Sequence, residues 1–338
     1  MPDDLGALLD PWDFALPDAQ IAREPTAERD QSRLYRVDGA PGVFADITTE
    51  LRAGDVLVMN DVRVFRARLR AFRASGGAVE AMISAPEGDD FHAFLRPGRR
   101  LQVGDRLTCG AGALVLVARH ADGTWTVRPE PDLDTLAATA GEVPLPPYLG
   151  RAPTAEDAER YQTVFARPGD LRASAAPTAG LHMTTRLLER IEAAGVQVVR
   201  VALEVGAGTF APLTAAAWTA GTLHTERYIV PEGTWNAVAA ARSEGRRVVS
   251  LGTTTLRVLE SMTGPGAGET DIFIRPGYAF KRVDALITNF HLPRSSLLML
   301  VSAFGGTPRV LEAYADAVKL GFRFYSYGDA MWLTRSER

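Results

Sequence analysis

The hydrophobic periodicity of this chain changes once along its length, and that change limits the folds it can adopt. Between about Arg66 and Glu130, short runs of alternating apolar and polar residues are separated by turns such as Gly104-Asp105. This pattern is typical of antiparallel strands. The last turn, Asp122-Gly123, separates LVLVARH from TWTVRPE and predicts a hairpin. Several such strands in succession predict a small β-barrel.

From Thr184 onward, helical and strand patterns alternate, as they do in layered α/β structure. The segment TTRLLERIEAAG predicts a helix that ends at Gly195 and leads into the strand VQVVRVALEV. Later helices are expected over Trp235–Gly245, near Thr254 and near Ser296, with RRVVSLG and VDALITNF as the intervening strands. The pair Thr307-Pro308 predicts the cap and first turn of a further helix.

The segment GEVPLPPYLGR separates the two patterns. Its prolines, Pro144, Pro146 and Pro147, make it stiff and extended, as expected of a crossing between domains. We therefore predict an α/β protein in which a large layered α/β domain over residues 1–65 and 149–338 carries an inserted antiparallel β-barrel domain over residues 66–148.

The composition favours a well-packed protein of one large or two smaller domains, because 46% of the 338 residues are apolar and 23% are charged. Acidic residues at Asp3, Asp4 and Asp10 stand where a secretory signal needs basic ones, and no long apolar run occurs. We expect a cytoplasmic protein without a membrane span. Cys109 is the only cysteine, so neither an internal disulfide nor a thiolate metal site is expected.

The basic residues are almost all arginine. Only Lys281 and Lys319 are lysines, leaving 35 of the 37 basic residues as arginine. The net charge of −4 argues against nucleic-acid binding through one dominant positive field, but it leaves a local patch open. Arginines gather in two clusters, Arg63, Arg66, Arg68, Arg70 and Arg73, and Arg96, Arg99 and Arg100. Their guanidinium groups could bind phosphates, although a solvated strand face explains both clusters equally well.

Two motifs place polar side chains at expected helix starts. In AAPTAGLHM, Thr178 and His182 precede a helix and could contact a ligand, or form a capped loop with a core histidine. In LGTTTLRVLES, Thr253 and Thr254 stand at a positive helix start, which suits a carboxylate or ribose hydroxyls, or else they cap the helix.

Three further motifs lie at strand ends. VGAGTF lacks the third glycine and the helix of a dinucleotide fingerprint, so Gly206 and Gly208 indicate either a tight strand exit beneath a ligand or a plain turn. Asn289 and His291 in TNFHLP, and Asp329 in FYSYGDAM, are predicted at the carboxyl ends of strands, the usual ligand edge of an α/β sheet.

Together these segments resemble the S-adenosylmethionine:tRNA ribosyltransferase-isomerase family of queuosine synthesis, from one end of the chain to the other. The matching segments, in the order of the family, are FALPDAQIAREPTAERDQSRL, LRAGDVLVMNDVRVFRARL, GEVPLPPYL, ERYQTVFA, APTAGLH, VGAGTF, the GTT and LES of the helix-start segment, FIRPGY, VDALITNFHLP, LMLVSAF and SYGDAM.

The resemblance implies an α/β domain with an inserted β-barrel, and no cofactor beyond S-adenosylmethionine as ribosyl donor. It implies tRNA as partner, with 7-aminomethyl-7-deazaguanine at the wobble position as acceptor. The products would be epoxyqueuosine in tRNA, adenine and methionine. The sulfonium acidifies the neighbouring ribose 5′-hydrogens, so a base could start the reaction and an acid could help adenine leave. No metal is implied, and we expect a monomer.

The resemblance also suggests roles for individual residues. We expect His182 or His291 to transfer a proton and Asp329 to act as an orienting or accepting carboxylate. The residues expected to hold S-adenosylmethionine are Thr178, Gly180, Gly206, Gly208, Thr253 and Thr254. The residues expected on the acceptor and tRNA side are Asn60, Arg63, Arg68, Glu204, His224 and Asn289.

The chain departs from the family pattern around one expected pocket. Glu204 and Gly221 stand where the family has histidines, Ala211 replaces a longer polar residue, and Arg66 takes a place often held by proline. A divergent paralogue that uses S-adenosylmethionine with another acceptor is therefore an alternative, and a catalytically silent RNA-binding relative is a second. A methyltransferase is disfavoured because no glycine-rich loop runs into a helix.

Overall fold

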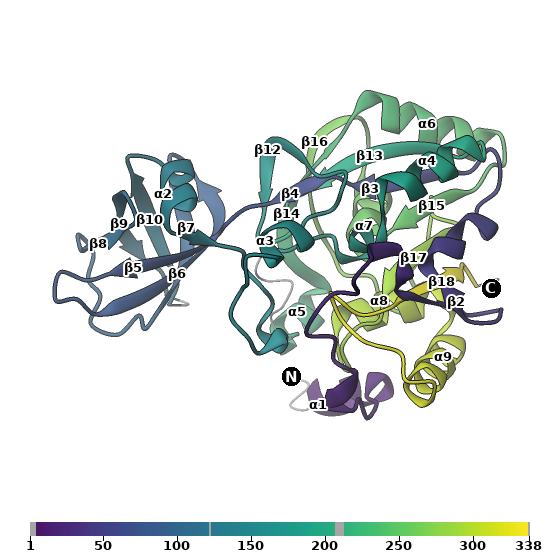
Figure 1. The fold of residues 1–338 in the computed structure, drawn as a ribbon, viewed down its shortest axis with the longest axis horizontal. Coiled ribbons are helices and arrows are strands. Elements are labelled where there is room, and N and C mark those ends of the chain that lie inside the picture. The colour runs from purple at the N-terminus through teal and green to yellow at the C-terminus, as the bar shows by residue number, and fades with distance from the viewer. Residues whose placement is uncertain (1–4, 122, 207–212, 337–338) are drawn as a thin grey trace.

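The structure is a computed structural model that describes residues 5–121, 123–206 and 213–336. A small barrel, drawn in blue in Figure 1, lies to one side of a larger α/β body and is joined to it by extended chain. The predicted fold class, a layered α/β structure with an inserted antiparallel barrel, is confirmed. None of the described helices is long and apolar enough to cross a bilayer.

The barrel is a closed antiparallel sheet. Its strands follow the order β5-β6-β7-β10-β9-β8, and pairing of β5 with β8 through Phe72 and Thr108 closes the ring. Along β5, Leu69 and Ala71 are buried and the residues between them point outward, so strand alternation fills the interior. The elements are β5 (Arg68–Phe72), β6 (Ala78–Glu87), β7 (Asp90–Arg96), β8 (Arg106–Cys109), β9 (Gly112–Arg119), β10 (Trp125–Glu130), α2 (Leu133–Ala140) and β11 (Gly141–Glu142).

The hairpin predicted around Asp122-Gly123 is present as β9 and β10, in which Trp125 pairs with Arg119. Helix α2 follows β10 and packs against the barrel, burying Leu136 in the core that contains Trp125. The proline-rich crossing begins beside the barrel, because β11 pairs with β5 through Gly141 and Leu69.

The α/β body is built on a nine-stranded sheet of order β16-β14-β13-β3-β15-β17-β18-β1-β2. Its central strands β13, β3, β15 and β17 are parallel, so their carboxyl ends lie at one edge. Strand β17 pairs antiparallel with β18. The strands are β1 (Arg33–Arg36), β2 (Gly42–Val43), β3 (Val56–Asn60), β13 (Gln197–Leu203), β14 (Thr222–Val230), β15 (Val248–Leu251), β16 (Gly266–Ile272), β17 (Ala285–Asn289) and β18 (Ala330–Thr334).

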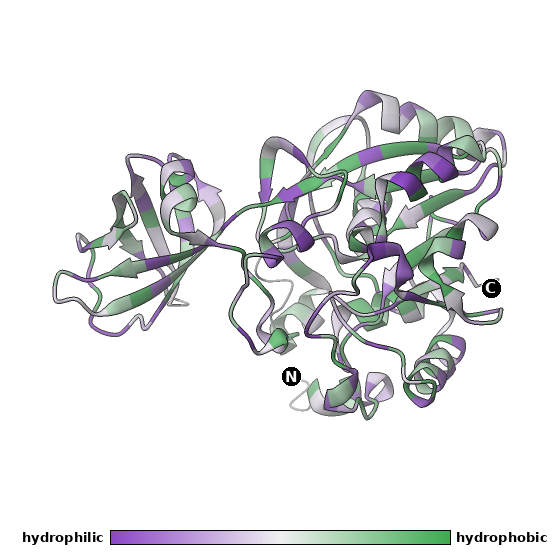
Figure 2. Ribbon diagram, viewed as in Figure 1, coloured by the Kyte–Doolittle hydropathy of each residue, from purple (hydrophilic) through white to green (hydrophobic). Residues whose placement is uncertain are grey.

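Both faces of this sheet are covered. Every residue of β3 is buried, with Val56 and Val58 in one core cluster and Leu57 and Met59 in another. This double burial is typical of parallel sheets. The covering helices are η4 (Phe44–Thr49), α4 (Thr185–Ala193), α6 (Glu232–Ser243), α7 (Thr253–Ser261), α8 (Ser296–Gly305) and α9 (Thr307–Lys319). Several residues of α4 are hydrophilic (Figure 2), and Leu187 and Ile191 are the residues that this helix buries.

Shorter elements complete the body. Strand β4 pairs parallel with β12 near the barrel, and α3 lies beside them. These elements are α1 (Leu5–Leu9), η1 (Asp10–Trp12), η2 (Asp18–Gln20), η3 (Arg29–Gln31), β4 (Val62–Val64), η5 (Pro147–Leu149), α3 (Asp157–Arg160), β12 (Arg167–Ala173), η6 (Thr178–His182) and α5 (Ala215–Ala220).

The predicted helix–strand units are confirmed, with one detail corrected. Helix α4 begins after Thr184, whose side chain accepts a hydrogen bond from the Leu187 amide, and the chain turns at Gly195 with φ of 83°. Helix α9 starts one residue earlier than predicted. Thr307 is its first residue, and the capping position is Gly306, which supplies no side-chain cap.

Candidate active site

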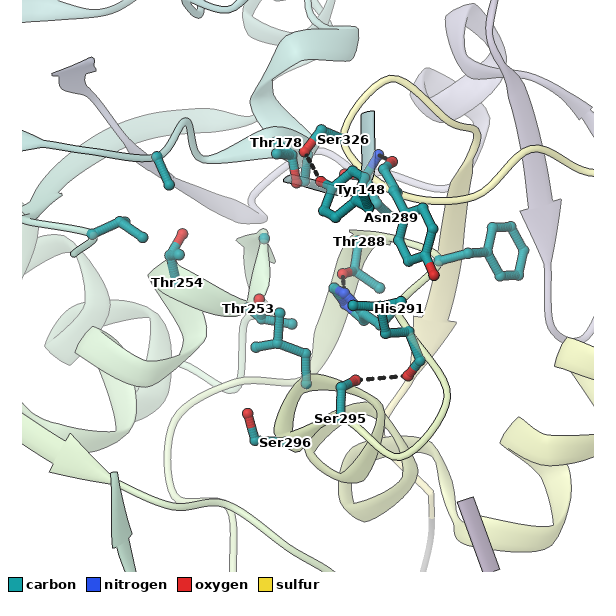
Figure 3. Close-up of a pocket in the computed structure, with 18 of the residues that line it drawn as sticks. Tyr148, Thr178, Thr253, Thr254, Thr288, Asn289, His291, Ser295, Ser296 and Ser326 are labelled. Carbon is teal, nitrogen blue, oxygen red and sulfur yellow. Dashed lines mark hydrogen bonds between the residues drawn. The ribbon is translucent and has the colours of Figure 1, made fainter. Parts of the chain in front are cut away.

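A cavity of about 520 Å³ opens at the carboxyl edge of β15 and β17 (Figure 3). Its walls come from the starts of α7 and α8, the segment 175–179 that leads into η6, and the chain around Tyr148 and Tyr325. Because β15 and β17 are adjacent parallel strands, the loops that follow them meet here. The sequence motifs that contain Thr178, Thr253 and Asn289 therefore come together at one site.

The start of α7 offers unpaired hydrogen-bonding groups to this cavity. The chain leaves β15 through Gly252, whose φ of 92° favours glycine, and no side chain caps the helix. Thr253 and Thr254 line the cavity, and the buried Thr254 Oγ1 has no hydrogen-bond partner among the described residues. An uncapped helix start with free hydroxyls suits a carboxylate or sugar hydroxyls. The cap role considered for these threonines is not observed.

His291 lies on the opposite side of the cavity from Thr254 (Figure 3). Its Nε2 is 2.9 Å from Thr288 Oγ1, and its backbone N–H donates to Tyr314 Oη at 3.0 Å. Burial lowers the pKa of the His291 imidazole to about 3. The ring is therefore neutral near pH 7. It can accept a proton at the ring nitrogen that does not contact Thr288.

His182 lies behind the cavity and does not line it. Its Nδ1 is 2.6 Å from Ser32 Oγ, and Asn289 Nδ2 lies 3.1 Å from its Nε2. The ring stacks on Phe44, and burial, followed by the charges of Arg323 and Arg29, lowers its pKa to about 3. Both ring nitrogens are thus occupied by protein groups, and His182 fixes Asn289, which does line the cavity.

Gly180 faces protein rather than the cavity. A Cβ at this position would lie 2.8 Å from Phe165 and Thr163 side-chain atoms. Thr178, two residues earlier, lines the cavity as predicted. Gly180 therefore allows η6 to pack closely against its neighbours and does not serve the approach of a ligand.

Two aromatic residues of the cavity wall were not predicted from the sequence. The rings of Tyr148 and Tyr325 stack with centroids 4.4 Å apart, and the Tyr148 hydroxyl is hydrogen-bonded to Ser326. Tyr148 lies in the proline-rich crossing and Tyr325 in FYSYGDAM, segments in which no local pattern marks an aromatic side chain as a ligand contact. In the structure, Tyr325 has a φ of 74°, which non-glycine residues rarely adopt and which marks a specialised position.

Asp329 is placed differently from the sequence prediction. It precedes β18 instead of ending a strand, and it reaches the sheet edge near Asn289 because β18 runs antiparallel to β17. Its buried carboxylate accepts the backbone N–H groups of Arg33 at 2.9 Å and Arg323 at 2.8 Å. The cavity wall does not include Asp329, so its observed contacts stabilise the chain and not a ligand.

Glu204, which departs from the family pattern, is buried and precedes Val205 of the cavity wall. Arg227 Nε lies 2.7 Å from Glu204 Oε2, so the Glu204 carboxylate is compensated. The partner of His224 is Glu226, 3.1 Å away, which also pairs with Arg257 and accepts the Gly206 amide at 3.4 Å.

Burial alone would raise the pKa of Glu226, but its bonds to His224 and Arg257 lower the pKa overall. Glu204, Gly206 and His224 are not part of the cavity wall, whereas Val205 is. Gly208, the other predicted glycine, lies outside the described residues.

The residues predicted to face tRNA divide into two groups. Asn60 is 1% exposed, and its Oδ1 accepts the amides of Leu203 and Val62, so it fixes a strand end and is out of reach of a macromolecule. Arg68 is paired with Glu80 at 2.5 Å. Arg63 is exposed, and within the described ranges it makes no ion pair.

Arg63 lies in a groove of about 540 Å³ between the barrel and the α/β body. Arg66, the second exposed arginine of this groove, also makes no ion pair with the residues that the structure describes. Arg172 lines the groove as well, but it is paired with Asp134 of α2 at 2.7 Å. The groove therefore presents two unpaired cationic side chains beside one neutralised pair.

The parallel central strands end in a largely apolar cavity with a few placed hydroxyl, amide and imidazole groups. This arrangement defines an α/β protein built to bind a small molecule. Within residues 5–121, 123–206 and 213–336 no cluster of three potential metal ligands occurs. The inserted barrel, with the groove beside it, distinguishes this protein from an ordinary doubly wound fold.

Comparison with known proteins identifies the family. The family described as "Queuosine biosynthesis protein" matches residues 9–333, and the chain belongs to it. A relative from Methylobacterium sp. (strain 4-46), named S-adenosylmethionine:tRNA ribosyltransferase-isomerase, is 49% identical over 97% of this chain and 99% of its own length. A relative of the same name from Anaeromyxobacter dehalogenans (strain 2CP-C) is 46% identical with the same coverage.

A solved structure agrees. The crystal structure of S-adenosylmethionine tRNA ribosyltransferase from Thermotoga maritima is 34% identical, has a TM-score of 0.54, and covers 95% of this chain and 99% of its own.

Proposed function

We propose that this protein is an S-adenosylmethionine:tRNA ribosyltransferase-isomerase that transfers and isomerises the ribosyl group of S-adenosylmethionine onto 7-aminomethyl-7-deazaguanine at the tRNA wobble position. The products are epoxyqueuosine in tRNA, adenine and methionine. The observation that carries the proposal is the meeting of three family motifs, APTAGLH, the GTT helix start and TNFHLP, around one cavity in a chain that matches its relatives over nearly its full length.

The cavity has the chemistry that S-adenosylmethionine requires. The uncapped start of α7, with Thr253 and Thr254, would receive the carboxylate of the methionine part. No carboxylate side chain belongs to the described wall, so the positive sulfonium would be stabilised by the aromatic faces of Tyr148 and Tyr325. Thr178 and Asn289 supply polar contacts for the ribose or adenine.

His291 is the residue we assign to proton transfer. It lines the cavity and is neutral, whereas the ring nitrogens of His182 are both engaged by protein side chains. A neutral imidazole is able to remove a ribose 5′-proton beside the sulfonium. His182 then acts indirectly, by holding the amide of Asn289.

The contacts of Glu204 favour the acceptor used by the family over a different one. An isolated carboxylate near the acceptor would keep its amine protonated and unreactive. Arg227 lies 2.7 Å from Glu204 and compensates its charge. The pair therefore carries no net charge, like the neutral imidazole of a histidine at this position. This pairing weakens the case for a divergent paralogue. His224 and Gly206 would act on the acceptor side through Glu226, the partner that they share.

We also infer the domain organisation of the protein, its contacts with tRNA, its compartment and its oligomeric state. Residues 66–148 form an inserted domain, since among the described strands those of the barrel pair only with one another and enclose their own core. The unpaired Arg63 and Arg66 in the groove would contact tRNA phosphates. The protein is a cytoplasmic monomer that uses no metal and no cofactor other than S-adenosylmethionine as co-substrate.

Mass spectrometry of nucleosides from host tRNA tests this function. A strain that lacks the gene should accumulate 7-aminomethyl-7-deazaguanine in tRNA and lose epoxyqueuosine and queuosine, and the gene on a plasmid should restore them. An unchanged nucleoside profile in the deletion strain would exclude the proposed acceptor.

A further inference from the structure

The outer surface of three barrel strands carries an alternation of cationic and aromatic side chains that the proposed reaction does not use. We define the barrel face as the outward side chains larger than alanine on β5, on residues 78–82 of β6 and on residues 94–96 of β7. These strands are neighbours in the sheet. The barrel face comprises Arg68, Arg70, Phe72, Glu80, Met82, Phe94 and Arg96.

Strand register places these side chains in rows across the sheet. Arg70 pairs with Glu80, which pairs with Arg96, so the two arginines flank one carboxylate. In the next row Arg68 pairs with Met82, which pairs with Phe94. Residues paired across adjacent strands lie about 5 Å apart on the same face, so each row is a continuous strip of side chains.

The two phenylalanines of the barrel face are exposed. Phe72 and Phe94 each keep 39% of their surface accessible, unusual for a side chain of this size. The Arg70 guanidinium lies 5.8 Å from the centre of the Phe72 ring, and His92 packs edge-on against Phe94. Both rings are therefore accessible, and the ring of Phe72 has a cation beside it.

The charge of the barrel face is net positive. Glu80, its one carboxylate, is neutralised by two hydrogen bonds from Arg68. Arg70 and Arg96 make no ion pair with any described residue.

Three further arginines stand beside this face. Arg73 donates to the carbonyl oxygens of Pro97 and Arg99, which fastens the loop after β7 to the end of β5. Arg99 and Arg100 in that loop are exposed. The free cationic charge is thus concentrated at the end of the face that carries Phe72.

The barrel face continues into the groove. Arg63 and Arg66 line the groove, and the same extended chain then enters β5 with Arg68, Arg70 and Phe72 pointing outward. A polyanion that crosses the groove would meet the barrel face next.

We propose that the barrel face binds the single-stranded loop of the tRNA substrate, with bases stacked on Phe72 and Phe94 and phosphates held by Arg70 and Arg96. Aromatic side chains on a sheet, interleaved with arginine, are the general means of holding unpaired nucleotides without reading their sequence. The inference rests on the proposed function, since it takes tRNA as the substrate. An apolar protein partner fits less well, because two unpaired arginines would be buried in its interface.

The test measures the affinity of the full-length protein for tRNA and for a hairpin that carries its anticodon loop, by fluorescence anisotropy. Replacing both rings by leucine, F72L/F94L, should weaken binding of either RNA by about 5- to 100-fold per stacked base. The aromatic variant F72Y/F94Y should bind like wild type. Affinity for S-adenosylmethionine and the Tm should stay unchanged in both variants, because both keep an apolar side chain.

The arginines are tested by salt dependence. R70Q/R96Q removes two phosphate contacts, so the slope of log Kd against log salt should decrease by about 1.4 for single-stranded RNA. The matched control is R119Q on β9, on the other side of the barrel, which should leave affinity and slope unchanged.

Equal tRNA affinity of F72L/F94L and wild type would overturn the barrel-face proposal while leaving the proposed function intact. Weakening of self-association by the leucine variant, without loss of RNA affinity, would overturn it in favour of an interface between copies of this chain. Absence of tRNA binding by wild-type protein would reject the proposed function and this inference together.

Discussion

At the scale of single residues, two buried histidines of equally low pKa have different surroundings. His182 is hydrogen-bonded to Ser32 and Asn289 through its two ring nitrogens. His291 lines the cavity, and Thr288 is the one described residue to which its ring is hydrogen-bonded. Sequence position alone could not separate them, because each follows a short polar motif. Contacts at the second ring nitrogen decide which histidine is able to exchange a proton with a ligand.

Replacing His291 by glutamine should lower turnover by about 10²-fold or more, since a positioned proton-transfer group contributes about that much. Burial lowers the pKa of His291 to about 3, so the base is already unprotonated at higher pH. The rate of adenine release should therefore show no acidic limb near pH 6.5. A wild-type limb near pH 6.5 that disappears in H291Q would contradict a neutral buried base.

A substitution at Glu204 tests whether the ion pair of Glu204 and Arg227 serves the reaction of the family. Replacing Glu204 by histidine leaves Arg227 without its partner and restores the residue type of the family. We expect lower activity on the 7-aminomethyl-7-deazaguanine substrate, because the half-exposed Arg227 loses the carboxylate that holds its side chain against the strand end beside the cavity. The double variant E204H/R227Q serves as control. Raised activity in E204H would instead indicate a protein whose acceptor has changed.

At the scale of elements, helix starts and strand ends were predictable, but their neighbours in space were not. Thr178, Thr253, Thr254, Asn289 and His291 meet at the cavity as their motifs suggested. Asp329 was misplaced because local pattern does not give strand direction, and β18 runs antiparallel to β17. Tyr148 was missed because its partner, Tyr325, is distant in sequence. Local chemistry is encoded in motifs, whereas pairing of elements depends on tertiary packing.

A substitution at Gly180 in η6 tests whether this glycine serves packing or ligand binding. Alanine at Gly180 would place its Cβ 2.8 Å from Phe165 and Thr163, so we expect a loss of about 1–3 kcal/mol in the free energy of unfolding. Chemical denaturation measures this loss. Gly169, where an added Cβ meets nothing within 4 Å, is the matched control. Unchanged stability of G180A together with weakened S-adenosylmethionine binding would show that Gly180 belongs to the ligand site.

At the scale of the whole molecule, the cavity and the barrel are parts of one binding system joined by the groove. Reversing charge at Arg63 and Arg66 should weaken tRNA binding at low salt and flatten its salt dependence, because two phosphate contacts become repulsive. S-adenosylmethionine affinity, measured by calorimetry, should not change. Arg190, an exposed arginine on α4 away from the groove, supplies the control substitution R190E. Unchanged tRNA affinity in R63E/R66E would show that tRNA does not bind in the groove.

The most direct measurement of the central claim follows the fate of S-adenosylmethionine when purified protein is mixed with tRNA that carries 7-aminomethyl-7-deazaguanine. Ribosyl transfer should release adenine and methionine together, in equal amounts, and should form epoxyqueuosine in the tRNA. Formation of S-adenosylhomocysteine would contradict it, since that product means methyl transfer in place of ribosyl transfer.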